Sequence, residues 1–199
     1  MGKKTEYNVA VVGAMGMVGT EMIRTLERRD FPVAELRPLD IAQNEGKEVS
    51  FKGSKVKVLE AKEENFKGVD IALFSAGGDA SLDLAPKAKK QGAIVVDNSS
   101  AWRMHPECPL VVPEVNPEDL DWHKGVIANP NCSTIQMMVA LKPIHDFANI
   151  KRVVVSTYQA VSGSGKKAFE GLKNETKQFI EDGEIREPQA YDYPIAFNC

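Results

Sequence analysis

An apolar run that ends in regularly spaced glycines is the feature that most constrains the fold of this chain. YNVAVVG is followed by AMGMVG, so Gly13, Gly16 and Gly19 recur at every third position. Such glycines permit a tight turn after a strand, close approach of the backbone to a pyrophosphate, and close packing of the next helix. That helix, expected over 17–29, has free N–H groups at its start. The pattern predicts a nucleotide-binding loop, with a tight turn that binds no ligand as the alternative.

Short apolar runs alternate with helical patterns along the first 130 residues. Such alternation predicts an α/β fold in which a parallel sheet is covered by helices on both faces, as in a Rossmann-like dinucleotide-binding domain. Pro38 weakens one expected strand, and Pro86 is expected to break or kink one helix. The strands are expected over 7–13, 33–40, 55–60, 68–78, 93–100 and 125–131, and the helices over 17–29 and 79–92.

The pattern changes near residue 130, which suggests two domains, 1–130 and 131–199. A helix is expected over 132–147, and its apolar residues predict a buried stripe. A strand over 151–165 should run into a Ser/Gly loop, and an amphipathic helix should follow over 166–181. The tail is rich in proline and aromatic residues and reads as irregular. The stripe consists of Met137, Met138, Leu141 and Ile144.

Composition excludes several classes of partner. The formal net charge of −3, with lysines and arginines scattered among acids, argues against binding to nucleic acid or to an acidic membrane. No apolar run approaches the length of a membrane span, and the N-terminus lacks the pattern of a secretory signal. Three widely spaced cysteines indicate a reducing compartment, so we expect a cytoplasmic protein without disulfides. No cysteine or histidine spacing suggests a metal site.

The segment ANPNCSTIQ places Cys132 at an expected helix start. The N–H groups and the positive end of a helix dipole favour a thiolate there and stabilise an oxyanion on a carbon bonded to the sulfur. Ser133 and Thr134 are expected to cap the first turn. Spacing alone leaves two interpretations open, a nucleophile and a small buried thiol.

Asp40 follows Gly19 at the end of the second expected strand. An acid in this position can accept a hydrogen bond from a ribose 2′-hydroxyl and repel a 2′-phosphate, which favours NAD over NADP. The alternative is a solvated aspartate at a strand end.

Six motifs, taken together and in order, closely resemble the aspartate-semialdehyde dehydrogenase family. They cover the chain from about residue 7 onward, and they are GAMGMVG, SAGG, DNSSAWRM, VPEVN, NPNCST and STYQAVSGSG. The resemblance implies that residues 131–199 begin an α+β catalytic and dimerisation domain. It also implies a homodimer and conversion of aspartyl-4-phosphate to aspartate 4-semialdehyde and phosphate with NADP or NAD, in lysine, methionine and threonine biosynthesis.

The resemblance also implies roles for individual residues. Cys132 would be the nucleophile that carries the acyl group, and Gln159 would orient the substrate. Arg103 and Asn131 would bind the phosphate, and no metal would be involved. The cofactor would contact the glycine loop, the end of the second strand and four further segments, at Gly13, Met15, Gly16, Met17, Val18, Gly19, Asp40, Gln43, Asn44, Gly77, Gly78, Asn98, Ser162 and Gly163.

Two departures from the family modify these expectations. Where the family has a stretch like SARSAGK, this chain has IAQNEGK, so Gln43 and Asn44 replace the arginine and serine that hold a 2′-phosphate. We therefore expect a reduced preference for NADP. Met15 also stands where the family often has threonine.

The family is longer, and its general-base histidine lies beyond this segment. His105, His123 and His145 do not match its motif and read as surface or loop residues. We therefore expect an N-terminal portion of the enzyme with little or no activity alone. The alternatives are an N-acetyl-glutamyl-phosphate reductase-like enzyme and a non-catalytic nucleotide-binding module.

Overall fold

A computed structural model describes residues 4–198 of the chain. The chain forms two compact units, Met1–Val153 and Val154–Cys199. The first unit holds the sheet and three of the helices described below, and the second holds the fourth. The boundary between functional domains at residue 130 remains a prediction from the sequence.

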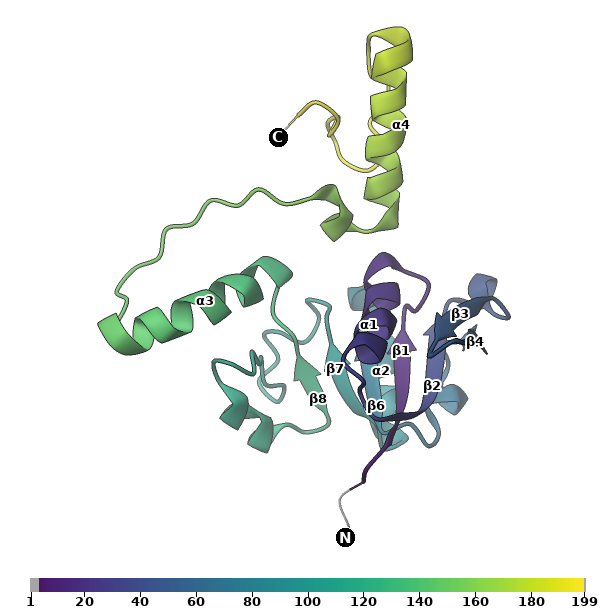
Figure 1. Cartoon of the computed structure of the whole chain (residues 1–199), viewed down its shortest axis with the longest axis vertical. Helices are drawn as coiled ribbons and strands as arrows, with labels where there is room; N and C mark the ends of the chain where they lie inside the picture. The colour runs from purple at the N-terminus through teal and green to yellow at the C-terminus, as the bar shows by residue number, and fades with distance from the viewer. Residues whose placement is uncertain (1–3, 199) are drawn as a thin grey trace. The chain divides into compact units, whose positions relative to one another are not determined.

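Within residues 4–198, six strands form one parallel sheet in the order β5-β2-β1-β6-β7-β8 (Figure 1). The chain therefore builds one half of the sheet outward from β1 and then crosses over to build the other half. This order is that of a Rossmann dinucleotide-binding fold, which confirms the predicted fold class. The strands are β1 (Tyr7–Val12), β2 (Val33–Asp40), β5 (Leu59–Glu60), β6 (Ile71–Phe74), β7 (Ile94–Asp97) and β8 (Val126–Ala128).

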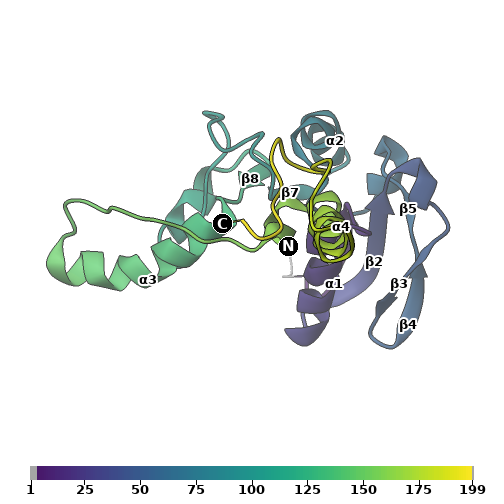
Figure 2. The same ribbon diagram turned by 90° about the horizontal axis from the view of Figure 1, so that it is seen from above.

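Alternating side chains of β1 bury both faces of this sheet. Val9 and Val11 pack in a cluster with Ile23 of helix α1 (Met17–Arg28). Ala10 and Val12 belong to a second cluster with α2 (Gly78–Lys90). Figure 2 shows the two helices on opposite sides of the sheet. Because both faces are covered, the strand reads in the sequence as an unbroken apolar run.

Neither internal proline interrupts its element. Pro38 is a buried residue within β2, and α2 continues through Pro86 without a break. The carbonyl of Leu39 accepts hydrogen bonds on the β1 side, so the nitrogen of Pro38 is directed toward the opposite neighbour, β5. Strand β5 pairs only with Leu39 and Asp40. The missing N–H therefore costs no ladder hydrogen bond.

The expected third strand divides into two pieces. Its first part belongs to β4 (Ser54–Lys57), which pairs in an antiparallel hairpin with the unexpected strand β3 (Glu48–Phe51), and its last part is the short edge strand β5. Short 3₁₀ helices connect several of these elements: η1 (Ala42–Asn44), η2 (Glu63–Phe66) and η3 (Pro117–Trp122).

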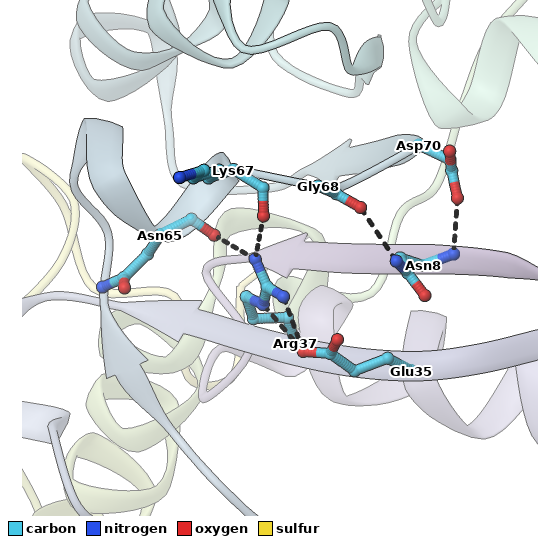
Figure 3. Close-up of polar contacts among 7 residues, drawn as sticks. All are labelled: Asn8, Glu35, Arg37, Asn65, Lys67, Gly68 and Asp70. Carbon is cyan, nitrogen blue, oxygen red and sulfur yellow. Dashed lines mark hydrogen bonds and ion pairs between the residues drawn. The ribbon is translucent and has the colours of Figure 1, made fainter.

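Polar contacts fasten the sheet around the amino ends of its central strands (Figure 3). Asp70, just before β6, accepts the backbone N–H of Asn8 at 2.8 Å and pairs with the ammonium of Lys4. Arg37 of β2 donates to Glu35 and to the carbonyl oxygens of Asn65 and Lys67, as Figure 3 shows. These contacts lie away from the carboxyl ends of the strands, where the glycine loop is found.

Helix α3 (Cys132–Ala148) forms where it is expected, but its apolar stripe is not buried. The helix is described over its whole length and contains no fully buried residue. Ile144 is 53% exposed, and Met137, Met138 and Leu141 are half-buried. The prediction of a buried stripe is wrong for this chain. Apolar periodicity indicates which face of a helix is apolar, but it does not indicate which element packs against that face.

The second unit contains η4 (Val161–Ser164) and the amphipathic helix α4 (Lys166–Asp182). The strand expected over 151–165 is wrong: residues 151–160 pair with no strand in the described chain, and an apolar run without a ladder partner stays a connecting segment. The tail after α4 is irregular, as predicted. It is held by the fully buried carboxylate of Glu175, which accepts backbone N–H groups from Gln189, Ile195 and Ala196.

Candidate active site

The glycine loop lies where the strand order of the sheet reverses, between β1 and β6. Gly13 has a φ of +81°, and a Cβ atom there would clash with the backbone carbonyl of Ser75 at the end of β6. A Cβ atom on Gly19 would clash with the carbonyl of Gly13. Both glycines are therefore required by close packing of the loop between the two strands and α1. Ligands of such sheets bind in the crevice at this reversal point.

A pocket of about 400 Å³ opens at this place. Gly13, Gly16, Asp40 and Ser75 are among its lining residues. Helix α1 begins beside it with Gly16 as its N-cap, a residue with no side chain to satisfy the first N–H groups. Met17 and Val18 form the exposed start of this helix. The volume, the uncapped helix start and the glycine backbone fit a nucleotide and its phosphates.

Asp40 is not a solvated strand-end aspartate. Its side chain lies in a residue that is only 8% exposed. One carboxylate oxygen accepts the N–H of Met15 at 2.8 Å, and the other accepts the N–H of Ile41 at 2.9 Å and the amide of Asn44 at 2.7 Å. The carboxylate thus ties the glycine loop to the turn that follows β2. Gln43 lies exposed in the same turn, in η1.

The SAGG motif starts a second helix next to the same pocket. Ser75 and Ala76 line the pocket, and Gly77, with a φ of +87°, is the N-cap of α2. Gly78 is the first residue of that helix. A positive φ is easily adopted only by glycine, which explains the residue type at Gly77. The structure therefore brings both glycine motifs to one edge of the sheet.

Arg103, Asn98 and Asn129 form a hydrogen-bonded cluster after β7 and β8. The guanidinium of Arg103 donates from Nε to the carbonyl of Asn129 at 3.0 Å and from Nη2 to the carbonyl of Asn98 at 3.1 Å. The amide of Asn129 donates to Oδ1 of Asn98 at 2.8 Å. Arg103 is thus held by the backbone carbonyl oxygens of two different segments. Asn129 was not singled out in the sequence, although its position directly after a strand is a usable signal.

A buried polar network lies beside this cluster. Asp97 and Ser81 are both fully buried, and the hydroxyl of Ser81 donates to the Asp97 carboxylate at 2.8 Å. The indole N–H of Trp102 donates to the oxygen of Ser81 at 3.0 Å. The network connects α2, the end of β7 and the loop that carries Arg103. Its members were missed because a strand-end aspartate and a helical serine carry no distinctive pattern.

Cys132 is the exposed first residue of α3. The helix is capped by Asn131, whose Oδ1 accepts the N–H groups of Ser133 at 3.0 Å and Thr134 at 3.3 Å. The expectation that Ser133 and Thr134 act as caps is therefore wrong, because they lie inside the first turn and donate to the cap. Cys132 is also not a buried thiol, so that interpretation is excluded.

Cys108, which belongs to the same unit, differs from Cys132 in its surroundings. Its side chain is buried, its Sγ lies 3.3 Å from the carbonyl oxygen of Val126, and burial raises the pKa of its thiol to about 11. Such a thiol is inert at neutral pH. Of the two cysteines that the structure describes, Cys132 is the accessible one.

The three histidines lie in turns or at a helix end. His105 and His123 each accept, through Nδ1, the N–H of the residue two positions later. His145 lies exposed in the last turn of α3. Their assignment as surface or loop residues is therefore confirmed.

Gln159, Ser162 and Gly163 belong to the second unit. A Cβ atom on Gly163 would clash with the side-chain amide of Gln159, so these two residues pack together. Their participation in a site with Cys132 remains a prediction from the sequence.

Within residues 4–198, no helix is both long enough and apolar enough to cross a membrane. The same residues contain no group of three or more His, Cys, Asp or Glu side chains that could hold a metal ion.

Comparison with known proteins matches two sequence families to the chain. Residues 8–123 match the NAD binding domain of semialdehyde dehydrogenase, and residues 141–199 match the semialdehyde dehydrogenase dimerisation domain. The first match covers more than half of the chain. The chain belongs to the semialdehyde dehydrogenase family. Its fold, its glycine loop and its helix-start cysteine agree with this membership.

Individual relatives are similar along almost the whole chain. The aspartate-semialdehyde dehydrogenase of Aquifex aeolicus is 61% identical over 97% of this chain and 58% of its own length. That of Bacillus subtilis is 52% identical over 96% of this chain and 57% of its own. A crystal structure of aspartate semialdehyde dehydrogenase II from Vibrio cholerae, complexed with ASA, aligns with a TM-score of 0.94 at 46% identity.

The alignment with the Vibrio structure covers 98% of this chain and 59% of that one. This chain therefore spans less than two thirds of the length of these relatives. The relatives favour an aspartate-semialdehyde dehydrogenase over an N-acetyl-glutamyl-phosphate reductase-like enzyme.

Proposed function

We propose that this chain carries the nucleotide-binding and thiol-bearing parts of an aspartate-semialdehyde dehydrogenase. The reaction is the reductive dephosphorylation of L-aspartyl-4-phosphate to L-aspartate 4-semialdehyde with NAD(P)H. The observation that carries the proposal is the exposed Cys132 at the start of α3, three residues after the Asn129 that binds Arg103. Relatives of that name at up to 61% identity support it.

Cys132 performs the covalent step. Its thiolate sulfur attacks the acyl carbon of the substrate, the bond from that carbon to the phosphate oxygen breaks, and inorganic phosphate leaves with the electron pair. A thioester on Cys132 results. Cys132 lies at the positive end of the α3 dipole, which stabilises the oxyanion that forms during attack.

Arg103 and Asn131 are proposed to hold the phosphate. Two N–H groups of the Arg103 guanidinium are engaged by the Asn98 and Asn129 carbonyls, which fixes the side chain. A guanidinium has five N–H donors, so others are left for an anion. Asn131 uses its side-chain oxygen as the helix cap, and its NH₂ group is the part suited to a phosphate oxygen. Gln159 is proposed to orient the substrate.

The cofactor is proposed to lie in the pocket beside the glycine loop. Bound NAD(P)H supplies the hydride that reduces the acyl group to the aldehyde. Met17, Val18 and Gly19 in the first turn of α1 are proposed to offer backbone N–H groups to the phosphates, and Gly13, Met15 and Gly16 to leave space for them. Gly77, Gly78 and Asn98 are proposed to line the cleft, Asp40, Gln43 and Asn44 to lie at the ribose end, and Ser162 and Gly163 to contact the nicotinamide.

The whole protein is proposed to be a cytoplasmic homodimer that acts on small molecules, in lysine, methionine and threonine biosynthesis. The match of residues 141–199 to a dimerisation domain supports the assembly. The acidic net charge of −3 supports the absence of a nucleic-acid partner.

A phosphate burst tests the proposed function on this chain. Thioester formation from an acyl phosphate requires a thiolate but no general base, because the attacking sulfur carries no proton. Phosphate release should therefore be observed without complete turnover. Mixing the chain with L-aspartyl phosphate should release phosphate up to one equivalent per chain, and the Cys132→Ser variant should release none above the spontaneous rate. An equal burst from both proteins would contradict the proposal.

A further inference from the structure

The carboxylate of Asp97, at the end of β7, is fully buried, and hydroxyl groups donate to both of its oxygens. Oδ1 accepts from Ser81 of α2 at 2.8 Å, and Oδ2 accepts from Ser99 at 2.5 Å. Burial of a carboxylate is costly unless its oxygens are hydrogen-bonded. The covalent step on Cys132 does not use this group, so its role lies in what its partners hold in place.

The direction of both hydroxyl contacts is fixed by a second neighbour of each serine. The indole N–H of Trp102 donates to the oxygen of Ser81 at 3.0 Å. The backbone N–H of Ala101 donates to the oxygen of Ser99 at 3.1 Å. Because an N–H group cannot accept, the hydrogen of each hydroxyl is left for Asp97. Position 97 therefore requires an acceptor at both oxygens, which a carboxylate provides and an amide does not.

The backbone of Asp97 is connected to both carbonyl groups that hold Arg103. One of them belongs to Asn98, the next residue in the chain, and accepts from Nη2 of the guanidinium. The other belongs to Asn129 and accepts from Nε. The N–H of Asn129 in turn donates to the backbone carbonyl of Asp97 at 2.8 Å. Both anchors of the guanidinium therefore depend on the placement of this one residue.

We propose that Asp97 is a positioning residue that holds Arg103 in place to bind the phosphate of the substrate. The side chain fixes the loop just before Arg103, and the backbone fixes the two anchors of the guanidinium. The inference rests on the proposed function, which assigns the phosphate to Arg103. Because Asp97 is fully buried, it acts through this loop. Its replacement should weaken substrate binding and leave the chemistry of Cys132 unchanged.

The phosphate burst, followed over a range of L-aspartyl phosphate concentrations, tests the inference. Asp97→Asn keeps the shape of the side chain but replaces one acceptor oxygen by a donor. It should raise the half-saturating concentration about tenfold, as expected when a binding group is displaced. The limiting burst rate should stay within about twofold, because binding alone is affected. Ser81→Ala removes one hydroxyl contact without changing the charge and should raise the half-saturating concentration by a smaller factor.

A variant without Arg103 shows whether Asp97 acts through it. Arg103→Met alone should raise the half-saturating concentration, and addition of Asp97→Asn should raise it no further, since two residues of one network are not additive. Asp70→Asn controls for a general loss of stability. It removes a carboxylate that fastens the opposite ends of the strands, and it should leave the half-saturating concentration and the limiting rate unchanged.

Two results would overturn the inference alone. One is an unchanged half-saturating concentration in Asp97→Asn or, if that variant does not fold, in Ser81→Ala. The other is an equal effect of Asp97→Asn in the presence and absence of Arg103, which would show that the residue does not act through the guanidinium. Absence of any burst from the unaltered chain would overturn the proposed function and the inference with it.

Discussion

The Nε atom of Arg103 donates a hydrogen bond to the carbonyl oxygen of Asn129 at 3.0 Å. This contact links the loop after β7 to the segment after β8 that leads into Cys132. Because the guanidinium also binds the carbonyl of Asn98, its position is fixed from two sides. A fixed cation near the start of the cysteine helix suits the phosphate of the proposed substrate.

Replacement of Arg103 should change the reactivity of Cys132 toward anions. The Arg103→Met variant should react with iodoacetate about two- to threefold more slowly relative to iodoacetamide, the effect of one unit charge acting through solvent over several ångströms. The ratio of the two alkylation rates is the measurement. Arg24→Met on α1, which removes an exposed arginine paired with Glu21, should leave the ratio unchanged. An unchanged ratio in the Arg103 variant would count against its role at the site.

Removal of the α3 cap should destabilise the helix. Asn131→Ala leaves the N–H groups of Ser133 and Thr134 without their acceptor, and should lower the free energy of unfolding by about 1 kcal/mol. Urea unfolding measures the loss. Asn131→Asp keeps a side-chain acceptor and should recover most of it. If aspartate and alanine destabilise the chain equally, the cap has no energetic role.

The two described cysteines should differ strongly in alkylation. Burial raises the pKa of the Cys108 thiol to about 11, so its thiolate is scarce at pH 8, whereas Cys132 is exposed at a helix start. Peptide mapping after limited treatment with iodoacetamide should find the label on Cys132 and not on Cys108. Treatment in urea should remove this selectivity. Faster labelling of Cys108 in the folded chain would contradict the assignment.

Acid should weaken the contacts of Asp70. Its pairing with Lys4 and the N–H of Asn8 hold the pKa of this carboxyl below its ordinary value of 3.8. A lowered pKa stabilises the folded chain above pH 3.8, and this stabilisation is lost as the pH falls toward the folded pKa. The free energy of unfolding of Asp70→Asn should therefore lie below that of the unaltered chain at pH 6 and approach it below pH 3.8. A difference that is independent of pH would exclude this linkage.

The tail of the second unit should depend on Glu175. Its buried carboxylate accepts three backbone N–H groups from 189–196, and Glu175→Ala would leave them without a protein acceptor, at a cost of about 1–3 kcal/mol. Hydrogen exchange of residues 189–196 should accelerate markedly in this variant. Glu181→Gln, an exposed change on the same helix, should have no effect. Equal exchange in both variants would show that the tail is held by other contacts.

Local patterns were enough to predict the fold class, the glycine loop and the cysteine at a helix start. The apolar runs around Val9 and Val95 are buried on both faces and need no knowledge of distant residues. The surroundings of those elements were harder to predict. The apolar stripe through Leu141 is not buried, and residues 151–160 pair with no strand among the described residues. Burial of a helix face and pairing of a strand both depend on residues far away in the sequence, which local patterns do not reveal.

Side-chain roles were also harder to predict where a residue type fits several uses. Asp40 could be placed at the pocket, but its engagement with Met15 and Asn44 depends on how two loops meet. Pro38 fits within its strand because β5 pairs only beyond it.

The location of the acyl group after reaction tests the central claim most directly. The chain is mixed with L-aspartyl phosphate, quenched in acid, digested and mapped by mass spectrometry. We expect a hydroxylamine-sensitive aspartyl thioester on the peptide that contains Cys132, and an unmodified peptide for Cys108. An acyl group distributed among lysines or on Cys108, or equal modification of the Cys132→Ser variant, would contradict it.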